Sequence, residues 1–269
     1  MAAGARGRER QDRIVGSETG KIGKTVGAGN ARVATGLTVA LAIAVAAVIL
    51  PKLALSGAVA RILTTQALEL GLSLGAIAVF GRGRFANYGF RLPRPDRHWS
   101  AALAGWMPIG LTALGLGTLA TAAMLACGGK GNPLVRELTF PQVILFVWIF
   151  SSTIEEVFTR GFLQSHIASA GEPRLGPRFL RIGRAALISA AFFAAMHLVL
   201  LLSHTDAVTV VIILLFTFSV GLLAAHQRER TGSLVPAIGV HMLANVGGVF
   251  GGIVYAIIAM LSGGAVPGR

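Results

Sequence analysis

Apolar runs of about 20 residues recur along this chain and constrain its fold more than any other feature. A helix needs about 20 mainly apolar residues to cross the hydrocarbon core of a bilayer. The chain is 54% hydrophobic and only 13% charged, whereas a soluble domain carries about 25% charged residues. We therefore expect a polytopic membrane protein, an all-α bundle of transmembrane helices with any active site in the bundle core.

The apolar runs predict about eight spans and three parts of the chain. The expected spans cover residues 33–50, 59–80, 101–126, 141–169, 184–202, 206–225, 232–247 and 248–262. Only a Gly-rich junction, residues 247–252, separates the last two. Residues 1–32 are expected to form a disordered basic cytoplasmic tail, 33–262 the helical domain, and 263–269 a short C-terminal tail.

The positive residues alternate between the two sides of the predicted bundle. The net charge is +13, and Lys and Arg gather in the first 32 residues and in the connections 82–97, 174–184 and 228–230. The other connections carry only Lys52, Lys130 and Arg136. This pattern predicts a cell-membrane protein with both termini in the cytoplasm and an even number of spans. The basic charge indicates attraction to anionic lipid, and no basic folded domain suggests a nucleic-acid partner.

Two adjacent glutamates, Glu155 and Glu156, interrupt the fourth apolar run, and Arg160 follows one helical turn later. A charged side chain at the bilayer centre costs about 2.5–3.5 kcal/mol on insertion scales. Such groups face the bundle interior and pair with one another, and they mark functional sites. Glu156 and Arg160 are four residues apart and of opposite sign, so they share a helix face, whereas Glu155 points elsewhere.

Three more polar residues lie within apolar spans and are candidate partners of these carboxylates. His197 lies in the fifth span, and His241 and Asn245 share a face of the seventh because they are four residues apart. At 1.5 Å per residue, Glu155, His197 and Asn245 lie about 20 Å from the starts of their helices and His241 about 14 Å. All four can therefore meet near the middle of a core about 30 Å thick.

Such a cluster has the groups that hydrolysis requires. A buried carboxylate can act as general base or acid, a histidine can hold or help deprotonate a water, and a second histidine with an amide can stabilise an oxyanion. Each residue also has a structural interpretation: an ion pair for Glu156 and Arg160, a satisfied interior histidine for His197, an interhelical hydrogen bond for Asn245. Their coincidence at one depth favours catalysis.

The same residues resemble the motifs of a known family. Glu155-Glu156-Val-Phe-Thr-Arg160, Phe193-Ala-Ala-Met-His197 and His241-Met-Leu-Ala-Asn245 are similar, in order and spacing, to the motifs of the CPBP intramembrane proteases, the CAAX-protease and bacteriocin-processing family. The resemblance covers a protease-like core at residues 140–247 and does not extend to the first three spans.

The resemblance implies a role for each residue. Glu155 is implied as the general base that activates water, with His197 assisting, and His241 with Asn245 as the oxyanion donors. Glu156 and Arg160 are implied as supporting residues. No cofactor is expected, since there is no His-Glu-x-x-His sequence. Zinc stays open as an alternative, with Glu155, His197 and His241 as the ligands if a metal is present.

We therefore expect a glutamic-type intramembrane endopeptidase that cuts a peptide bond in a membrane-associated protein or peptide. Two other classes remain open. One is a non-catalytic immunity or binding protein that holds a peptide in the same cavity. The other is a small proton-coupled transporter with the glutamates as proton relay. Glu69, in the second span beside Gln66 and Ser73, is interpreted as a structural residue that pairs with a basic group such as Arg160 or lines the same cavity.

Overall fold

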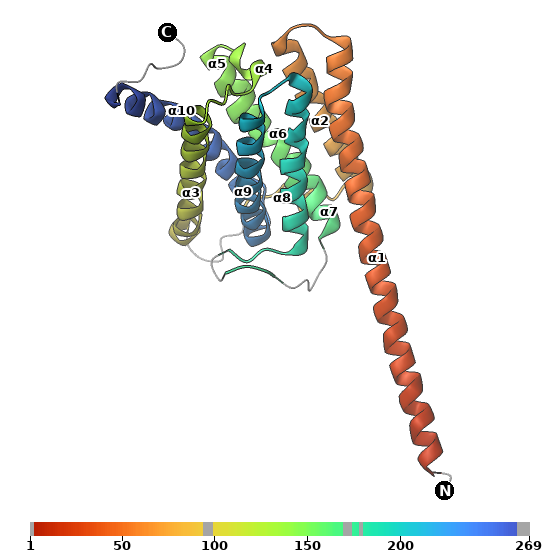
Figure 1. Cartoon of the computed structure of the whole chain (residues 1–269). Coiled ribbons are helices and arrows are strands. Elements are labelled where there is room, and N and C mark those ends of the chain that lie inside the picture. The colour runs from red at the N-terminus through yellow and green to blue at the C-terminus, as the bar shows by residue number, and fades with distance from the viewer. Residues whose placement is uncertain (1–2, 94–98, 169–173, 178–179, 263–269) are drawn as a thin grey trace.

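The computed structural model describes residues 3–93, 99–168, 174–177 and 180–262. In this part of the chain seven helices are long and apolar enough to cross a membrane. They confirm the predicted all-α polytopic bundle (Figure 1). The candidate spans are Gly29–Ala54, Ala58–Phe80, Gly105–Ala126, Phe140–Ile167, Arg184–Ser203, Ala207–Thr231 and Val235–Leu261.

The helical elements follow one another with short connections. In chain order they are α1 (Ala3–Ala54), α2 (Ala58–Phe80), the 3₁₀ turn η1 (Phe85–Tyr88), α3 (Trp99–Ala126), α4 (Pro133–Arg136), α5 (Phe140–Gln142), η2 (Val143–Ser151), α6 (Ser152–Glu156), η3 (Val157–Gln164), α7 (Ser165–Ile167), α8 (Arg184–Met196), η4 (His197–Ser203), α9 (Ala207–Thr231) and α10 (Val235–Leu261). Elements α5 to α7 form one continuous fourth span.

The number of spans in the described residues is seven and not eight, because the predicted seventh and eighth spans are one helix, α10. Its glycines do not break the helix but bring it close to α3. A β-carbon on Gly247 would collide with the carbonyl of Leu114, and one on Gly251 with that of Thr118. Close approach of two backbones is the usual role of small residues in membrane helices. The glycine spacing therefore serves helix packing within one chain.

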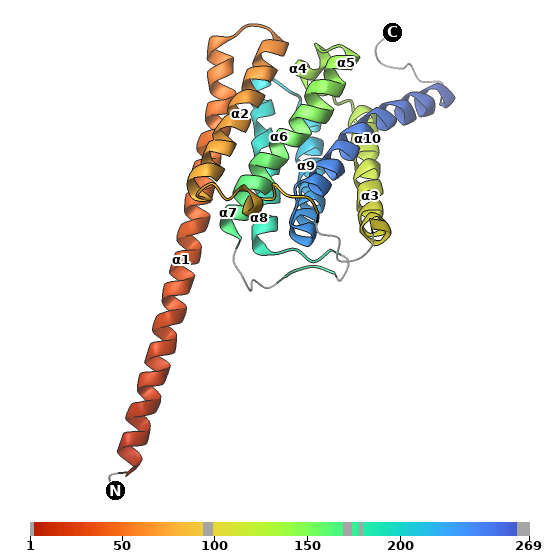
Figure 2. The same cartoon turned by 180° about the vertical axis from the view of Figure 1, so that it is seen from behind.

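The prediction that both termini lie in the cytoplasm stays a prediction. In Figures 1 and 2 the beginning of α1 lies at one end of the molecule, and the end of α10 lies at the other. The ends of α2 and α9 and the start of α8 lie at the same end as the beginning of α1 (Figure 1). Arg82, Arg84, Arg184, Arg228 and Arg230 thus belong to one face of the bundle. The alternation of charge holds, and only the last crossing was miscounted.

The two predicted tails, 1–32 and 263–269, differ in how much of them the structure describes. Helix α1 begins at Ala3, so it covers residues 3–32, where a disordered tail is predicted, although the candidate span within it begins only at Gly29. This segment contains no proline that would end a helix, since the first proline inside α1 is Pro51. The predicted C-terminal tail, 263–269, lies outside the described residues, as does part of the basic connection at 94–98.

Two apolar clusters hold the two sides of the bundle together. On one side Phe158 and Phe162 of η3 pack with Ile77 of α2 and Ile43 of α1. On the other side α9 and α10 form a second cluster with α3, centred on buried residues that include Val220, Val240 and Ala244. Figure 2 shows α6 between α2 and α10. The two glutamates of α6 therefore lie where the two halves of the bundle adjoin.

Candidate active site

The fourth span is irregular on both sides of its glutamates. The α-helical turn Ser152–Glu156 lies between two π-helical runs, Val143–Ser151 and Val157–Gln164. π-Helical turns are uncommon and are frequent at functional sites. Here their carbonyl groups accept bonds from other helices: Phe146 O from Gln66 Nε2 at 2.7 Å, and Thr159 O from Ser189 Oγ at 2.8 Å. The irregular span is thus tied to α2 and α8.

Glu156 is the closed end of the polar network. Its side chain and that of Arg160 are both fully buried, and Arg160 Nη1 donates to Glu156 Oε1 at 3.0 Å. The same oxygen lies 3.0 Å from His241 Nδ1. Arg160 Nη1 also donates to Thr159 Oγ1 at 2.6 Å, and the guanidinium lies over the ring of Phe193. A buried charge pair of this kind is costly to break, because either partner alone would be left uncompensated.

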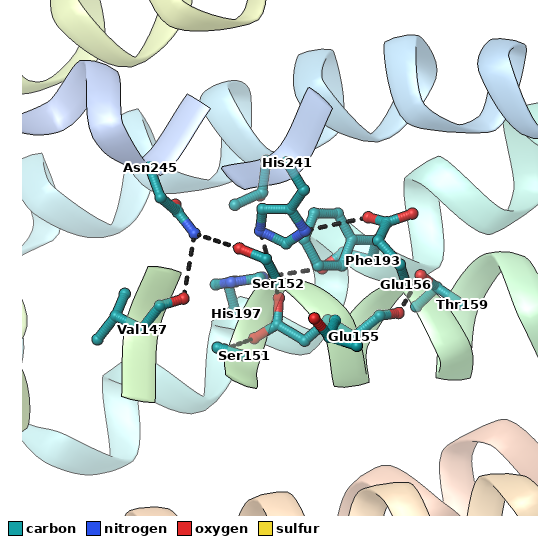
Figure 3. A network of polar contacts seen from close by, with 12 residues as sticks. Val147, Ser151, Ser152, Glu155, Glu156, Thr159, Phe193, His197, His241 and Asn245 are labelled. Carbon is teal, nitrogen blue, oxygen red and sulfur yellow. Dashed lines mark hydrogen bonds and ion pairs between the residues drawn. The ribbon is translucent and has the colours of Figure 1, made fainter. Parts of the chain in front are cut away.

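Glu155 has a different environment although it is the next residue. Its side chain is 18% exposed. Ser151 Oγ donates to Glu155 Oε1 at 2.5 Å, and Glu155 Oε2 lies 3.7 Å from His241 Nε2. Figure 3 shows the Glu155 side chain among Ser151, Ser152 and the two histidines. Glu155 thus has no Lys or Arg bonded to it in the described part of the chain, and one of its oxygens faces His241 at a distance that leaves it able to bind another group.

His241 joins the two glutamates. Its side chain is 7% exposed, and its two ring nitrogens face Glu156 and Glu155 respectively. Because the carboxylate of Glu156 accepts at 3.0 Å, Nδ1 carries a proton and Nε2 faces Glu155. A carboxylate bonded to one nitrogen of a histidine fixes the orientation of the ring. His241 is therefore held in one orientation between both carboxylates.

His197 lies where α8 changes into the 3₁₀ turn η4, and it is half-buried. Its Nδ1 lies 2.9 Å from the carbonyl oxygen of Phe193. A carbonyl can only accept, so Nδ1 carries the proton and the neutral ring keeps Nε2 as an acceptor. Phe193 meets both histidine rings edge-on, with centroids 5.1 Å from His197 and 5.4 Å from His241. Phe193 thus spaces the two histidines, a role that its own chemistry does not reveal in the sequence.

Asn245 connects α10 to the fourth span. Its Nδ2 donates to Ser152 Oγ at 2.9 Å and lies 3.4 Å from Val147 O. Asn245 lies one turn beyond His241, so the two residues face the same span, as their spacing predicts. Ser151 and Ser152 are site residues that the sequence analysis missed. The signal was available for Ser151, which precedes Glu155 by four residues and so shares its helix face.

Glu69 lies beside Glu155 and is not an ion-pair partner of Arg160 in the described structure. It is 7% exposed and close enough to Glu155 for the two carboxylates to repel each other. Glu69 Oε1, Gln66 Oε1 and Ser73 Oγ are buried, and none has a hydrogen-bond partner among the described residues. The α2 face therefore lines the same polar interior, the second of the two interpretations made from the sequence.

Among the described residues no group of three His, Cys, Asp or Glu side chains gathers in a geometry that would hold a metal ion, the set Glu155, His197 and His241 included. The Nδ1 atoms of His197 and His241 are committed to Phe193 O and to Glu156. A metal would have to be bound through the Nε2 atoms and Glu155. Whether the chemistry needs a metal stays a prediction.

The comparison with protein families agrees with the motif resemblance. Residues 137–247 match the family described as type II CAAX prenyl endopeptidase Rce1-like. The matched segment begins just before α5 and ends within α10, so it contains Glu155, His197, His241 and Asn245. No curated protein and no solved structure matches the chain.

Proposed function

We propose that this chain is an intramembrane endopeptidase in which Glu155 activates water, since residues 137–247 match the family described as type II CAAX prenyl endopeptidase Rce1-like. The observation that carries the proposal is the contrast between the two glutamates. Glu156 is fully buried and bonded to Arg160 and His241, whereas Glu155 keeps an oxygen beside His241 Nε2 and a partly exposed side chain. Of the two glutamates, Glu155 is therefore the one that we propose meets water.

The proposed reaction begins with a water bound to the Glu155 carboxylate. Glu155 removes one proton as the water oxygen attacks the scissile carbonyl carbon, and the carbonyl oxygen takes the negative charge. Ser151 holds the carboxylate by donating to its other oxygen at 2.5 Å. The proton on Glu155 then passes to the leaving nitrogen as the C–N bond breaks and the carbonyl re-forms, so that the products are a carboxylic acid and an amine and Glu155 returns to its carboxylate.

His241 is the donor best placed for the oxyanion. Its Nδ1 faces Glu156 and its Nε2 faces Glu155, so the ring lies at the carboxylate that is proposed to hold the water and can donate to a developing negative charge there. Asn245 is the second proposed donor, and to act it must share the amide hydrogens that now bind Ser152 and lie near Val147. His197, with an acceptor Nε2, is proposed to orient the attacking water.

The substrate class follows from the position of the site. The carboxylates lie on a transmembrane helix, so the scissile bond must reach the bilayer interior, and a membrane-associated protein or peptide satisfies this condition. The family name makes a lipidated C-terminal peptide one candidate. A soluble, unanchored peptide would lack the affinity for the bilayer that brings a substrate to such a site.

Comparison of the membrane and secreted proteomes of cells carrying wild-type chain and Glu155→Gln tests this proposal. Gln has the shape of Glu but cannot take a proton from water, so products present with wild type should be missing with the variant. Ser219→Ala, which changes an exposed hydroxyl on α9, is a matched control that should cleave normally. Unchanged product patterns with Glu155→Gln contradict the proposal. Immunity or peptide binding that survives the variant favours a binding protein, and proton-coupled flux in liposomes favours a transporter.

A chelator distinguishes the glutamic mechanism from a zinc mechanism. If Glu155 alone activates water, activity of the purified chain should be unchanged after treatment with a strong chelator. Loss of activity that zinc restores would assign Glu155, His197 and His241 as metal ligands.

A further inference from the structure

A second polar site lies at the basic end of the bundle, away from the glutamates. A cavity of about 240 Å³ opens where α1, α2 and the fourth span come together, near the residue at which α2 ends. The residues around it are Arg32, Phe80, Gly81, Arg82, Arg84, Asn87, Tyr88 and Ser165. Three of them are arginines and none is acidic, so the cavity has a positive charge and several hydrogen-bond donors.

The three arginines have no partner that would neutralise them. Within the described residues, the side chains of Arg32, Arg82 and Arg84 form no hydrogen bond and no ion pair. All three arginines are exposed, and they surround one cavity that no acidic residue lines, so their positive charges add there. The charge of the cavity therefore indicates an anionic ligand.

The turn that follows α2, residues 81–84, has two residues with a positive φ. Arg82 has a φ of +49°, one of two non-glycine residues with a positive φ in the described chain, and Gly83 follows with a φ of +74°. At Gly81 a β-carbon would lie 2.5 Å from Ile77 O and 2.7 Å from the ring of Tyr88, so only glycine fits. A non-glycine residue in the left-handed region is costly and is enriched at ligand-binding positions. Here the left-handed Arg82 ends α2, since the backbone N–H of Gly83 donates to Ala78 O at 3.0 Å, and the turn directs the chain around the cavity.

A fourth arginine, Arg228, does not line the cavity but bonds to two residues that do. Arg228 of α9 is only 9% exposed and donates through Nη2 to Asn87 O at 3.1 Å and to Ser165 Oγ at 3.0 Å. Both recipients line the cavity. Arg228 Nε is buried and has no hydrogen-bond partner among the described residues. Arg228 thus fixes two lining residues and adds positive charge beneath them.

We propose that this cavity binds the phosphate group of an anionic membrane lipid. Arginine is the residue best suited to phosphate, because its planar group donates two parallel hydrogen bonds. The cavity lies at the ends of the candidate spans Gly29–Ala54 and Ala58–Phe80, which is the depth of the lipid headgroups. The same face carries most of the basic residues, where anionic lipid would be attracted. Tyr88 and Asn87 offer further donors to the phosphate or to its headgroup.

The site is connected to the candidate active site through the chain between them. Ser165 Oγ, which accepts from Arg228, donates to the carbonyl of Arg160 at 2.9 Å. Arg160 in turn holds Glu156. Occupation of the cavity would therefore fix the end of the fourth span that carries both glutamates. Binding itself does not depend on proteolysis, so it can be measured whether or not the proposed function is correct.

Lipid binding to the full chain in a neutral detergent tests the proposal. The probes are short-chain phosphatidylglycerol, phosphatidylcholine with the same acyl chains, and inorganic phosphate. The double variant Arg82→Gln/Arg84→Gln should bind phosphatidylglycerol at least about tenfold more weakly than wild type, since it loses charge-assisted hydrogen bonds. The matched control Lys130→Gln/Arg136→Gln removes two exposed cations from the opposite face and should leave affinity unchanged. The single variant Arg32→Gln should weaken binding by a smaller factor.

Three results would overturn the proposal. Equal affinity of wild type and the double variant would remove the cavity as the site. Equal weakening by the control variant would show attraction to surface charge in general. Displacement of phosphatidylglycerol by inorganic phosphate at equal concentration would identify a soluble phosphate as the ligand in place of a lipid.

Discussion

Glu155 and Glu156 are consecutive residues of the same type, but they lie in different environments at the two ends of one polar network. At the Glu156 end, Arg160 and His241 bind one carboxylate oxygen, and the ion pair has no exposed surface. At the Glu155 end, the partners are a serine and the far nitrogen of the same histidine, and the side chain is partly exposed. Two consecutive glutamates can therefore have different roles: Glu156 holds the helices together, and Glu155 stays available for chemistry.

The first way to break this comparison is to remove the ion pair. Arg160→Met leaves the buried Glu156 carboxylate without its partner, so we expect the bundle to lose about 3–5 kcal/mol of stability. The double variant Arg160→Met/Glu156→Gln should recover part of this loss, because no buried charge remains unpaired. Thermal unfolding in a fixed lipid nanodisc measures both. If the double variant is as unstable as the sum of the single variants, the ion pair is not what holds this end.

The second prediction concerns His241, which belongs to both ends. His241→Gln keeps a donor toward Glu156 but loses the ring nitrogen beside Glu155, so cleavage should fall by about 10²–10³. The loss of stability should be smaller than for Arg160→Met. Initial rates on a substrate found by the proteomic comparison give the answer, with melting temperature as the folding control. A variant that loses its fold with no separate effect on rate would make His241 structural.

Asn245→Ala tests the Glu155 end of the network. It removes the bonds to Ser152 and the contact with Val147 and leaves the Glu156 end intact. We expect about tenfold slower cleavage and a small loss of stability. Ser152→Ala removes the same interhelical bond from the other partner. If both variants slow cleavage equally, Asn245 acts by positioning the helices and not as an oxyanion donor.

The smallest expected effect lies outside the network, at the start of α9. The Asp206 carboxylate accepts from the backbone N–H of Lys130 and from the N–H and hydroxyl of Thr209, which lowers its pKa to about 2. The folded pKa is depressed, so this stabilisation is present above the unfolded pKa and is lost as pH falls toward 2. Asp206→Asn should lower the melting temperature by a few degrees at neutral pH. The difference should narrow in acid, and a constant difference would contradict the linkage.

Sequence periodicity predicted most of the fold, and the cost of burying charge singled out the candidate site residues, whose roles stay predictions. Long apolar runs located the spans, and the depth of Glu155, His241 and Asn245 along separate helices indicated that they meet. The count failed at Gly247 and Gly251, because glycine ends helices in water but permits close packing in a membrane.

Other features could not be predicted because they depend on tertiary contacts. The π-helical runs on both sides of Ser152–Glu156 have no signature in residue type, and the bond from Asn245 to Ser152 depends on how α10 crosses the fourth span. The same holds for the different surroundings of Glu155 and Glu156. Spacing shows that the two point apart, but only the packed helices decide which of them is enclosed.

One measurement tests the central claim most directly: cleavage rate and melting temperature of Glu155→Gln and Glu156→Gln, taken in the same nanodiscs on the same substrate. We predict that Glu155→Gln melts like wild type and cleaves about 10³-fold more slowly, while Glu156→Gln loses stability. Cleavage by Glu155→Gln within tenfold of wild type, or a loss of stability as large as that of Glu156→Gln, would contradict the division between the two glutamates.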